Sequence, residues 1–302
     1  MPPNEPDPKY GLYLGPERHH VDQVPWEVSQ FGKRSYNDKG EGECWVVGSK
    51  VDMTKRQFTL MPCFRADVPD DDPMVDGHGQ NVKPALIVRG KPRITKDGKV
   101  NARLPHCNSA ARRAEIAEYD DSVNVYWDPK AMAGPNVMDA WLEDYDEQTR
   151  CGRGVKRKRR LLGLDNWGPQ KAPPFQRKAK RRRIKLAYTP EDCTDLVAVI
   201  DDGPGNELKK RMVKYYGEDL SSSDARLEAW KNGKVSTSER RILATKWLGR
   251  AWKEYCTNHQ EEITKSFKHC GMYNALDGSE NHLIRLRKWK GYKAPSKEDD
   301  KE

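Results

Sequence analysis

The chain has 302 residues, of which 35% are apolar and 33% charged, and its formal net charge is +9. No apolar run approaches the ~18 residues that a membrane-spanning helix needs, and the first residues lack the basic and apolar segments of a signal peptide. The seven cysteines form no CxxC pair, which argues against a zinc module and a disulfide framework and favours a reducing compartment.

Strands are the main prediction for the first half of the chain. Short apolar stretches bounded by polar, Pro or Gly residues are typical of strands. They lie at residues 19–24 (ending at Pro25), 44–48, 56–60, 85–88 and 123–127. Residues 91–120 carry no clear pattern. A helix is expected from Pro135, because apolar residues then recur at helical spacing; these are Val137, Met138, Trp141, Leu142 and Tyr145.

Strands and helices alternate in the next part of the chain. Residues 160–164 are a short apolar run, typical of a buried central strand, and the run ends at Asp165. A basic helix over 175–183 leads into a strand over 184–188, and the apolar stretch 196–200 closes on Asp201. A helix is expected next, with four apolar side chains turned inward: Leu208, Met212, Val213 and Tyr216.

The last part of the chain is predicted to be all-helical. Ser236 and Glu239 have the spacing of a capping box. The stripe behind them is more typical of a buried core than of a base-stacking surface; it consists of Leu243, Trp247, Ala251, Trp252 and Tyr255. The whole order of elements predicts a mixed α/β sheet whose acids gather at the carboxyl ends of central strands, where ligands of open α/β sheets bind.

Positive charge is concentrated between residues 151 and 185, where 14 Lys or Arg stand against one acid, Asp165. Such runs serve as nuclear-import signals, as nucleic-acid contacts or simply as a solvated face. A patch this dense is expected to bind phosphate backbones with release of counterions. The residues expected to contact nucleic acid are Lys156, Arg157, Lys158, Arg159, Arg160, Arg177, Lys178, Lys180, Arg181, Arg182 and Arg183.

Three carboxylates are candidate site residues because each follows a short apolar stretch: Asp22, Asp165 and Asp201. A single Asp at a strand end is ordinarily a turn or cap residue. Two-metal phosphoryl chemistry, however, needs acids from separate elements that converge on two metal ions.

Several segments resemble the DDE-type transposases of the pogo and jerky group, within the mariner superfamily, to which centromere protein B also belongs. Residues 20–25 resemble the first-aspartate motif of the group, 46–50 and 55–60 the meander that follows, and 164–166 with Gln170 the second-aspartate motif. Residues 193–201, with Gly203 and Lys209, resemble the third. The interval of 36 residues from Asp165 to Asp201 is close to the mid-thirties spacing typical of the group.

The resemblance implies a ribonuclease H-like fold, a mixed five-stranded sheet flanked by helices, with an all-helical C-terminal part. It implies that Asp22, Asp165 and Asp201 bind two Mg²⁺ or Mn²⁺ ions and carry the catalysis, with Asp202 as an alternative third acid. Asn166 and Gln170 would support the second acid. The activity implied is DNA strand cleavage and strand transfer on double-stranded DNA in the nucleus, with no membrane partner and with a homodimer left open.

The domain organisation expected is an irregular lead-in over 1–16 and a catalytic domain over 17–220, in which 61–122 is variable and loop-rich. A helical extension of that domain follows over 221–292, and then a disordered tail over 293–302. The helix-turn-helix region that precedes the first acid in the group has no counterpart here, so a truncated or domesticated transposase is expected. The alternative is a catalytically retired nuclear DNA-binding protein that keeps the fold.

Overall fold

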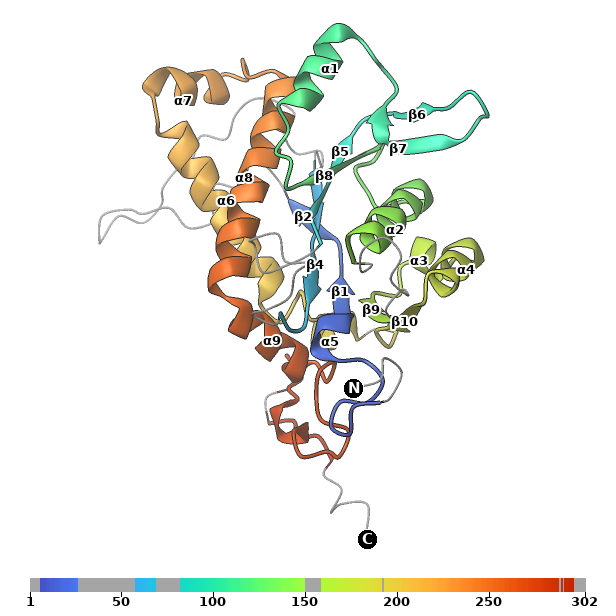
Figure 1. Ribbon diagram of the computed structural model, residues 1–302. Coiled ribbons are helices and arrows are strands. Elements are labelled where there is room, and N and C mark those ends of the chain that lie inside the picture. The colour runs from blue at the N-terminus through green and yellow to red at the C-terminus, as the bar shows by residue number, and fades with distance from the viewer. Residues whose placement is uncertain are drawn as a thin grey trace, which may run out of the picture.

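The computed structural model describes residues 6–26, 58–68, 82–149, 159–191, 193–287, 289 and 291–295 (Figure 1). The strand expected at 44–48 lies outside these residues, as do Lys156, Arg157 and Lys158. The described part is a mixed α/β fold, as the order of predicted elements indicates, and from residue 193 onward it contains helices and turns but no strand. Among the described helices, none combines the length and the apolar character needed to cross a membrane.

The described strands are β1 (Arg18–Val21), β2 (Val24–Trp26), β3 (Phe58–Met61), β4 (Cys63–Arg65), β5 (Ala85–Arg89), β6 (Pro92–Ile94), β7 (Val100–Pro105), β8 (Asn124–Asp128), β9 (Arg160–Leu164) and β10 (Ile184–Tyr188). The helices are α1 (Ala110–Ala117), α2 (Pro135–Thr149), α3 (Gly168–Lys171), α4 (Pro173–Arg181), α5 (Thr194–Val197), α6 (Pro204–Leu220), α7 (Asp224–Lys231), α8 (Thr237–Asn258) and α9 (Gln260–His269). Short 3₁₀ turns lie at Gly15–Glu17 and Asn281–Leu283.

The main strands form two four-stranded sheets, in the orders β10-β9-β1-β4 and β2-β3-β5-β8. The strands β1 and β2 lie on one chain segment, 18–26, and pair with β4 and β3, which lie on another, 58–65. Both pairings keep the same register, so the two sheets are continuous in alignment along these segments. The ladder is interrupted where this register sets Asp22 opposite Pro62. Proline has no N–H to donate, so the interruption at Asp22 follows from the sequence of the facing strand.

Helices cover both faces of the sheets (Figure 1). Alternate residues of β3 to β5 enter two separate cores, as the two-residue period of a strand requires: Leu60, Phe64, Leu86 and Val88 pack with α6, α8 and α9, and Met61, Cys63, Ala85 and Ile87 pack with α2 and α4. β9 is central, parallel to both neighbours and almost entirely buried, as predicted from its apolar run.

Most of the predicted helices are confirmed. All five stripe residues of α2 are buried, and so are all five of α8. The helix α8 begins after Ser236, whose side chain accepts a hydrogen bond from the backbone N–H of Glu239. In α6 the expected orientation is wrong at one position: Val213 is 41% exposed, and Tyr215 is buried instead.

Two further expectations need correction. Pro25 does not end a strand but lies inside β2, where it is exposed and opposite Thr59 at the edge of its sheet, a position that tolerates proline. The apolar stretch 196–200 is not a strand: it continues from α5 into a turn, because the amides of residues 196–198 bond to carbonyls of residues 193 and 194, and the amide of Asp201 bonds to the carbonyl of Ala198.

Residues 91–120, which have no clear sequence pattern, contain the β6–β7 hairpin and α1. The helix α1 is tied to α8 by a buried ion pair: Glu115 accepts from Arg241 at 2.6 and 3.1 Å and from the Tyr119 hydroxyl at 2.5 Å. These bonds lower the pKa of Glu115 to about 2 against the opposing effect of burial. All five cysteines in the described part are free thiols, consistent with the expectation of no disulfide framework.

Candidate active site

Asp22 and Asp165 come directly after two adjacent parallel strands, β1 and β9. The register pairs His20 with Gly163, so two residues further along it sets Asp22 beside Asp165. Neighbouring strands lie about 4.8 Å apart. The continued register therefore places the two aspartates predicted at strand ends at neighbouring positions on one sheet.

Asp201 reaches the site from a turn rather than from a strand. It stands between α5 and α6, where its backbone N–H donates to Ala198 O at 3.1 Å. The apolar residues that precede it, Val199 and Ile200, are buried in the core formed with α6, α8 and α9. The apolar stretch thus anchors the turn, and the turn presents the third acid.

The pKa of Asp22 depends on both other acids. The pKa of Asp22 rises from its ordinary 3.8 to about 7, first because the side chain is buried and then because the carboxylates of Asp201 and Asp165 repel its charge. The hydrogen bond from the Gln23 backbone N–H, at 2.6 Å, acts in the opposite direction. Asp22 therefore lies within electrostatic reach of both other acids.

Asp165 is held by two hydrogen bonds to one of its oxygens. The backbone N–H of Asn166 and the hydroxyl of Thr194 both donate to Oδ1, each at 2.6 Å. The Asn166 side chain donates instead to the backbone carbonyl of Thr189. Thr194 was not among the site residues expected from sequence; its place within the stretch 193–201, which resembles the third-aspartate motif, was the only available signal.

Gln170 lies in α3 and is buried. Its backbone carbonyl accepts from the Tyr188 hydroxyl at 2.7 Å, whereas its side-chain oxygen has no hydrogen-bond partner in the described part of the chain. The described hydrogen bonds therefore connect Gln170 to β10 and do not connect it to Asp165.

Asp201 and Asp202 differ in their surroundings. The Oδ2 atom of Asp202 accepts from Nδ1 of His269, at the end of α9, at 2.9 Å. The Asp201 carboxylate is 42% exposed and lies 4.0 Å from the guanidinium of Arg287, which also donates to the Asp201 backbone carbonyl. Of these two carboxylates, Asp201 is the one whose charge raises the pKa of Asp22. The geometry favours Asp201 as the third acid of the cluster.

His20 is a further polar group beside the acids. It precedes Asp22 by two residues on β1, so both side chains are on the same face of the strand. Burial lowers the pKa of His20 to about 4, and the Asp165 carboxylate opposes that effect, so the ring is neutral at pH 7. Neither ring nitrogen has a hydrogen-bond partner among the described residues.

Gly163 allows His20 and Met272 to pack against β9. A Cβ atom at position 163 would lie 2.4 Å from Met272 Cε and 2.8 Å from the His20 ring. We expect Gly163→Ala to lower the free energy of unfolding by about 1–3 kcal/mol, measured by urea denaturation, because overpacking a core costs that much. Gly217→Ala is the matched control, since a Cβ there meets nothing within 4 Å and alanine favours the helix. Equal or opposite changes in the two variants would contradict this account.

The donor set suits a hard divalent cation, because carboxylate oxygens are the ligands that Mg²⁺ prefers. The mutual repulsion recorded in the pKa of Asp22 is also what a divalent cation would relieve. Within the described residues, no group of three or more His, Cys, Asp or Glu side chains is already arranged closely enough to hold an ion. The carboxylates therefore suit a metal by the chemistry of their oxygens, and not by a metal-binding arrangement of the described side chains.

The described basic residues that were expected to bind nucleic acid differ in their exposure. Arg159, Arg177, Lys180, Arg181 and Arg183 are exposed. Lys178 and Arg182 are partly buried and form ion pairs with acids of α2. Arg160 corrects the prediction, since it is 2% exposed and bonded to Asp146 at 2.8 Å. It holds β9 to α2 and is not available to DNA.

Comparison with known proteins gives one family match. A search of curated proteins found no match. A family model described as DDE superfamily endonuclease matches residues 78–267, more than half of the chain. The matched stretch contains Asp165 and Asp201 and begins after Asp22. The chain belongs to the DDE superfamily of endonucleases.

Proposed function

We propose that this chain is the metal-dependent DNA strand-cleavage and strand-transfer domain of a transposase of the pogo and jerky group, and that Asp22, Asp165 and Asp201 carry the reaction. The observation that supports it most directly is the pKa of Asp22, which both other acids raise although they come from separate elements. The family match supports a transposase-type nuclease. The subgroup rests on the sequence motifs around the three acids.

A ribonuclease H-like core is part of this proposal. Joined at their common register, β1 with β2 and β4 with β3 make two long strands. The order is then β10, β9, the first long strand, the second long strand and β5, with only the second running antiparallel to the others. In this reading β8 is an additional edge strand. The first acid lies within a long strand and the second at the end of its parallel neighbour.

DDE-type endonucleases generally use divalent metal ions, and we propose two Mg²⁺ or Mn²⁺ held by Asp22, Asp165 and Asp201. When bound, the ions would supply the activation of water, or of a 3′-hydroxyl, and the neutralisation of charge on the phosphate. Thr194 and the Asn166 backbone fix the orientation of Asp165 through their hydrogen bonds. The neutral His20 ring adds no positive charge next to the acids, so the cluster keeps its affinity for cations.

Plasmid nicking tests the proposal. We expect Mg²⁺- or Mn²⁺-dependent nicking by the wild-type chain, and a loss of at least about 10²-fold in Asp165→Ala. Asp224→Asn removes an exposed carboxylate in the first turn of α7 and should leave nicking unchanged. Equal nicking by wild type and Asp165→Ala would end the catalytic proposal. Salt-sensitive DNA binding that ignores the metal, without nicking, would support the retired DNA-binding protein instead.

We also propose a nuclear location, because the cluster 177–183 is basic and several of its side chains are exposed. The measurement is fluorescence microscopy of the tagged chain, compared with a variant in which Arg177, Lys180 and Arg181 are changed to Gln. Equal nuclear accumulation of the two proteins would contradict a role of the cluster 177–183 in nuclear location.

A further inference from the structure

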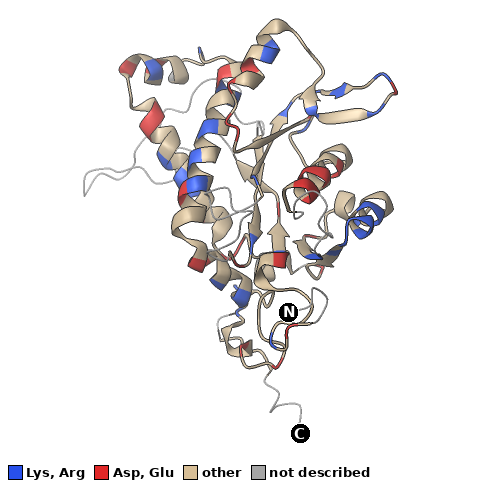
Figure 2. Ribbon diagram, in the orientation of Figure 1, with Lys and Arg blue, Asp and Glu red and all other residues tan. Residues whose placement is uncertain are grey.

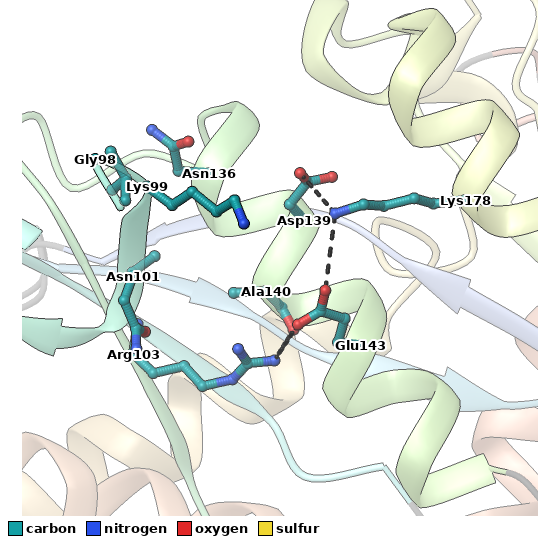
Figure 3. A pocket seen from close by; sticks show the side chains of 11 residues that line it. Gly98, Lys99, Asn101, Arg103, Asn136, Asp139, Ala140, Glu143 and Lys178 are labelled. Atoms are coloured by element: carbon teal, nitrogen blue, oxygen red, sulfur yellow. Dashed lines mark hydrogen bonds and ion pairs between the residues drawn. The ribbon is translucent and has the colours of Figure 1, made fainter. Parts of the chain in front are cut away.

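A groove lies between the β6–β7 hairpin and α4, with α2 as its floor. Its volume is about 550 Å³. In Figure 3, Lys99 and Arg103 point from the hairpin toward α2, and Lys178 points toward α2 from the opposite side, on α4. Figure 2 shows positive segments on the hairpin and on α4, with the acidic helix α2 between them.

Both sides of this groove are strongly basic. Residues 91–103 include five Lys or Arg and one Asp, and residues 173–183 include six Lys or Arg and no acid. On the hairpin Lys91, Lys96 and Lys99 are exposed, as are Arg177, Lys180 and Arg181 on α4. Lys99 pairs with Asp97 at 2.9 Å, but both side chains are more than half exposed, and such pairs cost little to open.

The acids on the floor are already neutralised by the chain itself. Asp139 pairs with Lys178 at 2.9 Å, and Glu143 pairs with Arg103 at 3.2 Å and with Lys178 at 3.7 Å. Of the cations that line the groove, Lys99 is therefore the exposed one, and the other exposed lysines and arginines belong to the same two segments outside its lining. The side chains of Asn101 and Asn136, which also line it, are neutral and able to donate to phosphate oxygens.

The groove is connected to the acid cluster through the start of α2. The backbone N–H of Ala133 donates to the side chain of Gln23 at 2.9 Å, and the Trp167 indole donates to Ala133 O at 3.2 Å. Gln23 and Trp167 follow Asp22 and Asp165 closely in sequence. Asn136 is three residues beyond Ala133, which the chain spans in at most about 11 Å.

We propose that this groove binds the sugar-phosphate backbone of duplex DNA beside the acid cluster, with the β6–β7 hairpin as one arm and α4 as the other. The assignment of the neighbouring carboxylates as the cleavage site rests on the proposed function; the groove's affinity for duplex does not. Binding is therefore measured with EDTA present, where cleavage chemistry does not contribute.

The test is fluorescence anisotropy of the full chain with a labelled 20-base-pair duplex over a series of salt concentrations. In the hairpin variant, Lys91, Lys96 and Lys99 are changed to Gln, and in the α4 variant Arg177, Lys180 and Arg181 are. In each we expect the slope of log Kd against log salt to become shallower by about 2–3, and binding at 0.1 M salt to weaken at least about tenfold. The matched control changes three exposed lysines on the α7–α8 side, Lys234, Lys246 and Lys253, and should keep the wild-type slope.

Each outcome of the binding experiment either supports or overturns the proposed groove. A hairpin variant that behaves like the control overturns the proposal, even if the α4 variant binds weakly. Hairpin-dependent binding of polyglutamate as tight as that of the duplex also overturns it, because the groove would then be a surface for acidic proteins. Weakened binding by both arm variants supports the groove even if the wild-type chain never nicks DNA. Nicking that requires Asp165 but not the arms supports the function and rejects the groove.

Discussion

Asp22→Asn should make the metal-free protein more stable at pH 8 and at the same time abolish its nicking activity. The pKa of about 7 means that the folded protein disfavours the charged form of Asp22, because burial and the carboxylates of Asp165 and Asp201 oppose it. Asparagine has nearly the same shape and no charge. We expect the free energy of unfolding to rise by about 1–3 kcal/mol, and nicking to fall by at least about 10²-fold.

The free energy of unfolding gained by Asp22→Asn should increase as pH rises. Below about pH 3.8 the carboxyl group is protonated in the folded and unfolded states, so the substitution changes little. Between about pH 4 and 7 the unfolded chain releases the proton while the folded chain retains it, so the wild-type protein loses stability as pH rises. The gain from Asp22→Asn should therefore be absent at pH 3.5 and complete above pH 7. Urea denaturation in EDTA measures it.

Addition of Mg²⁺ provides the control for the Asp22 prediction. The ion should stabilise the wild-type protein, because an ion that binds only the folded state shifts the unfolding equilibrium. It should stabilise Asp22→Asn much less. A variant less stable than wild type at pH 8 would show that the three carboxylates do not repel one another in the folded chain.

Glu115→Gln should have the largest effect on stability, a loss of about 3–5 kcal/mol at pH 7. The substitution leaves the buried guanidinium of Arg241 without its negative partner. The pKa of about 2 means that this carboxylate stabilises the fold fully above pH 4.5, its ordinary value. That stabilisation is lost as pH falls from 4.5 toward 2. The difference between wild type and variant should shrink over that range, the reverse of the trend for Asp22.

The matched control for Glu115 is Glu218→Gln. Glu218 pairs with Arg250, another arginine of α8, at 3.3 Å, but both side chains are about half exposed. Exposed pairs contribute about 0–1 kcal/mol. Denaturation curves in which Glu115→Gln and Glu218→Gln unfold at the same urea concentration would contradict the role given to the buried pair.

Local patterns in the sequence were sufficient for the elements whose burial leaves a short-range mark on the sequence. The continuous apolar run before Asp165 indicated a buried strand, and the apolar stripes at helical spacing indicated the helices α2 and α8. The same reasoning predicted all three acids at strand ends, which is right for Asp22 and Asp165 and wrong for Asp201, which stands in a turn. The β6–β7 hairpin carries no such pattern, since its apolar residues Ile94 and Val100 are exposed.

Three features could not be predicted because they depend on contacts between distant segments. The turn that carries Asp201 is apolar because it packs against α6, so its composition resembles that of a strand. Arg160 belongs to a basic run in sequence, yet its charge is buried against Asp146, which is 14 residues earlier. Thr194 reaches Asp165 across 29 residues. Periodicity and charge counts carry no information about such pairs.

Pro62, opposite Asp22 in the shared register, also disfavours other registers between the segments 18–26 and 58–65. If the segment 58–65 slid by two residues along its partner, the proline would face His20 or Val24, and a ladder bond would be lost within β1 or β2. In the native alignment the missing donor falls at the gap between those strands. Pro62, which takes no chemical part in the proposed reaction, thus helps to fix the position along the strand at which the Asp22 carboxylate lies.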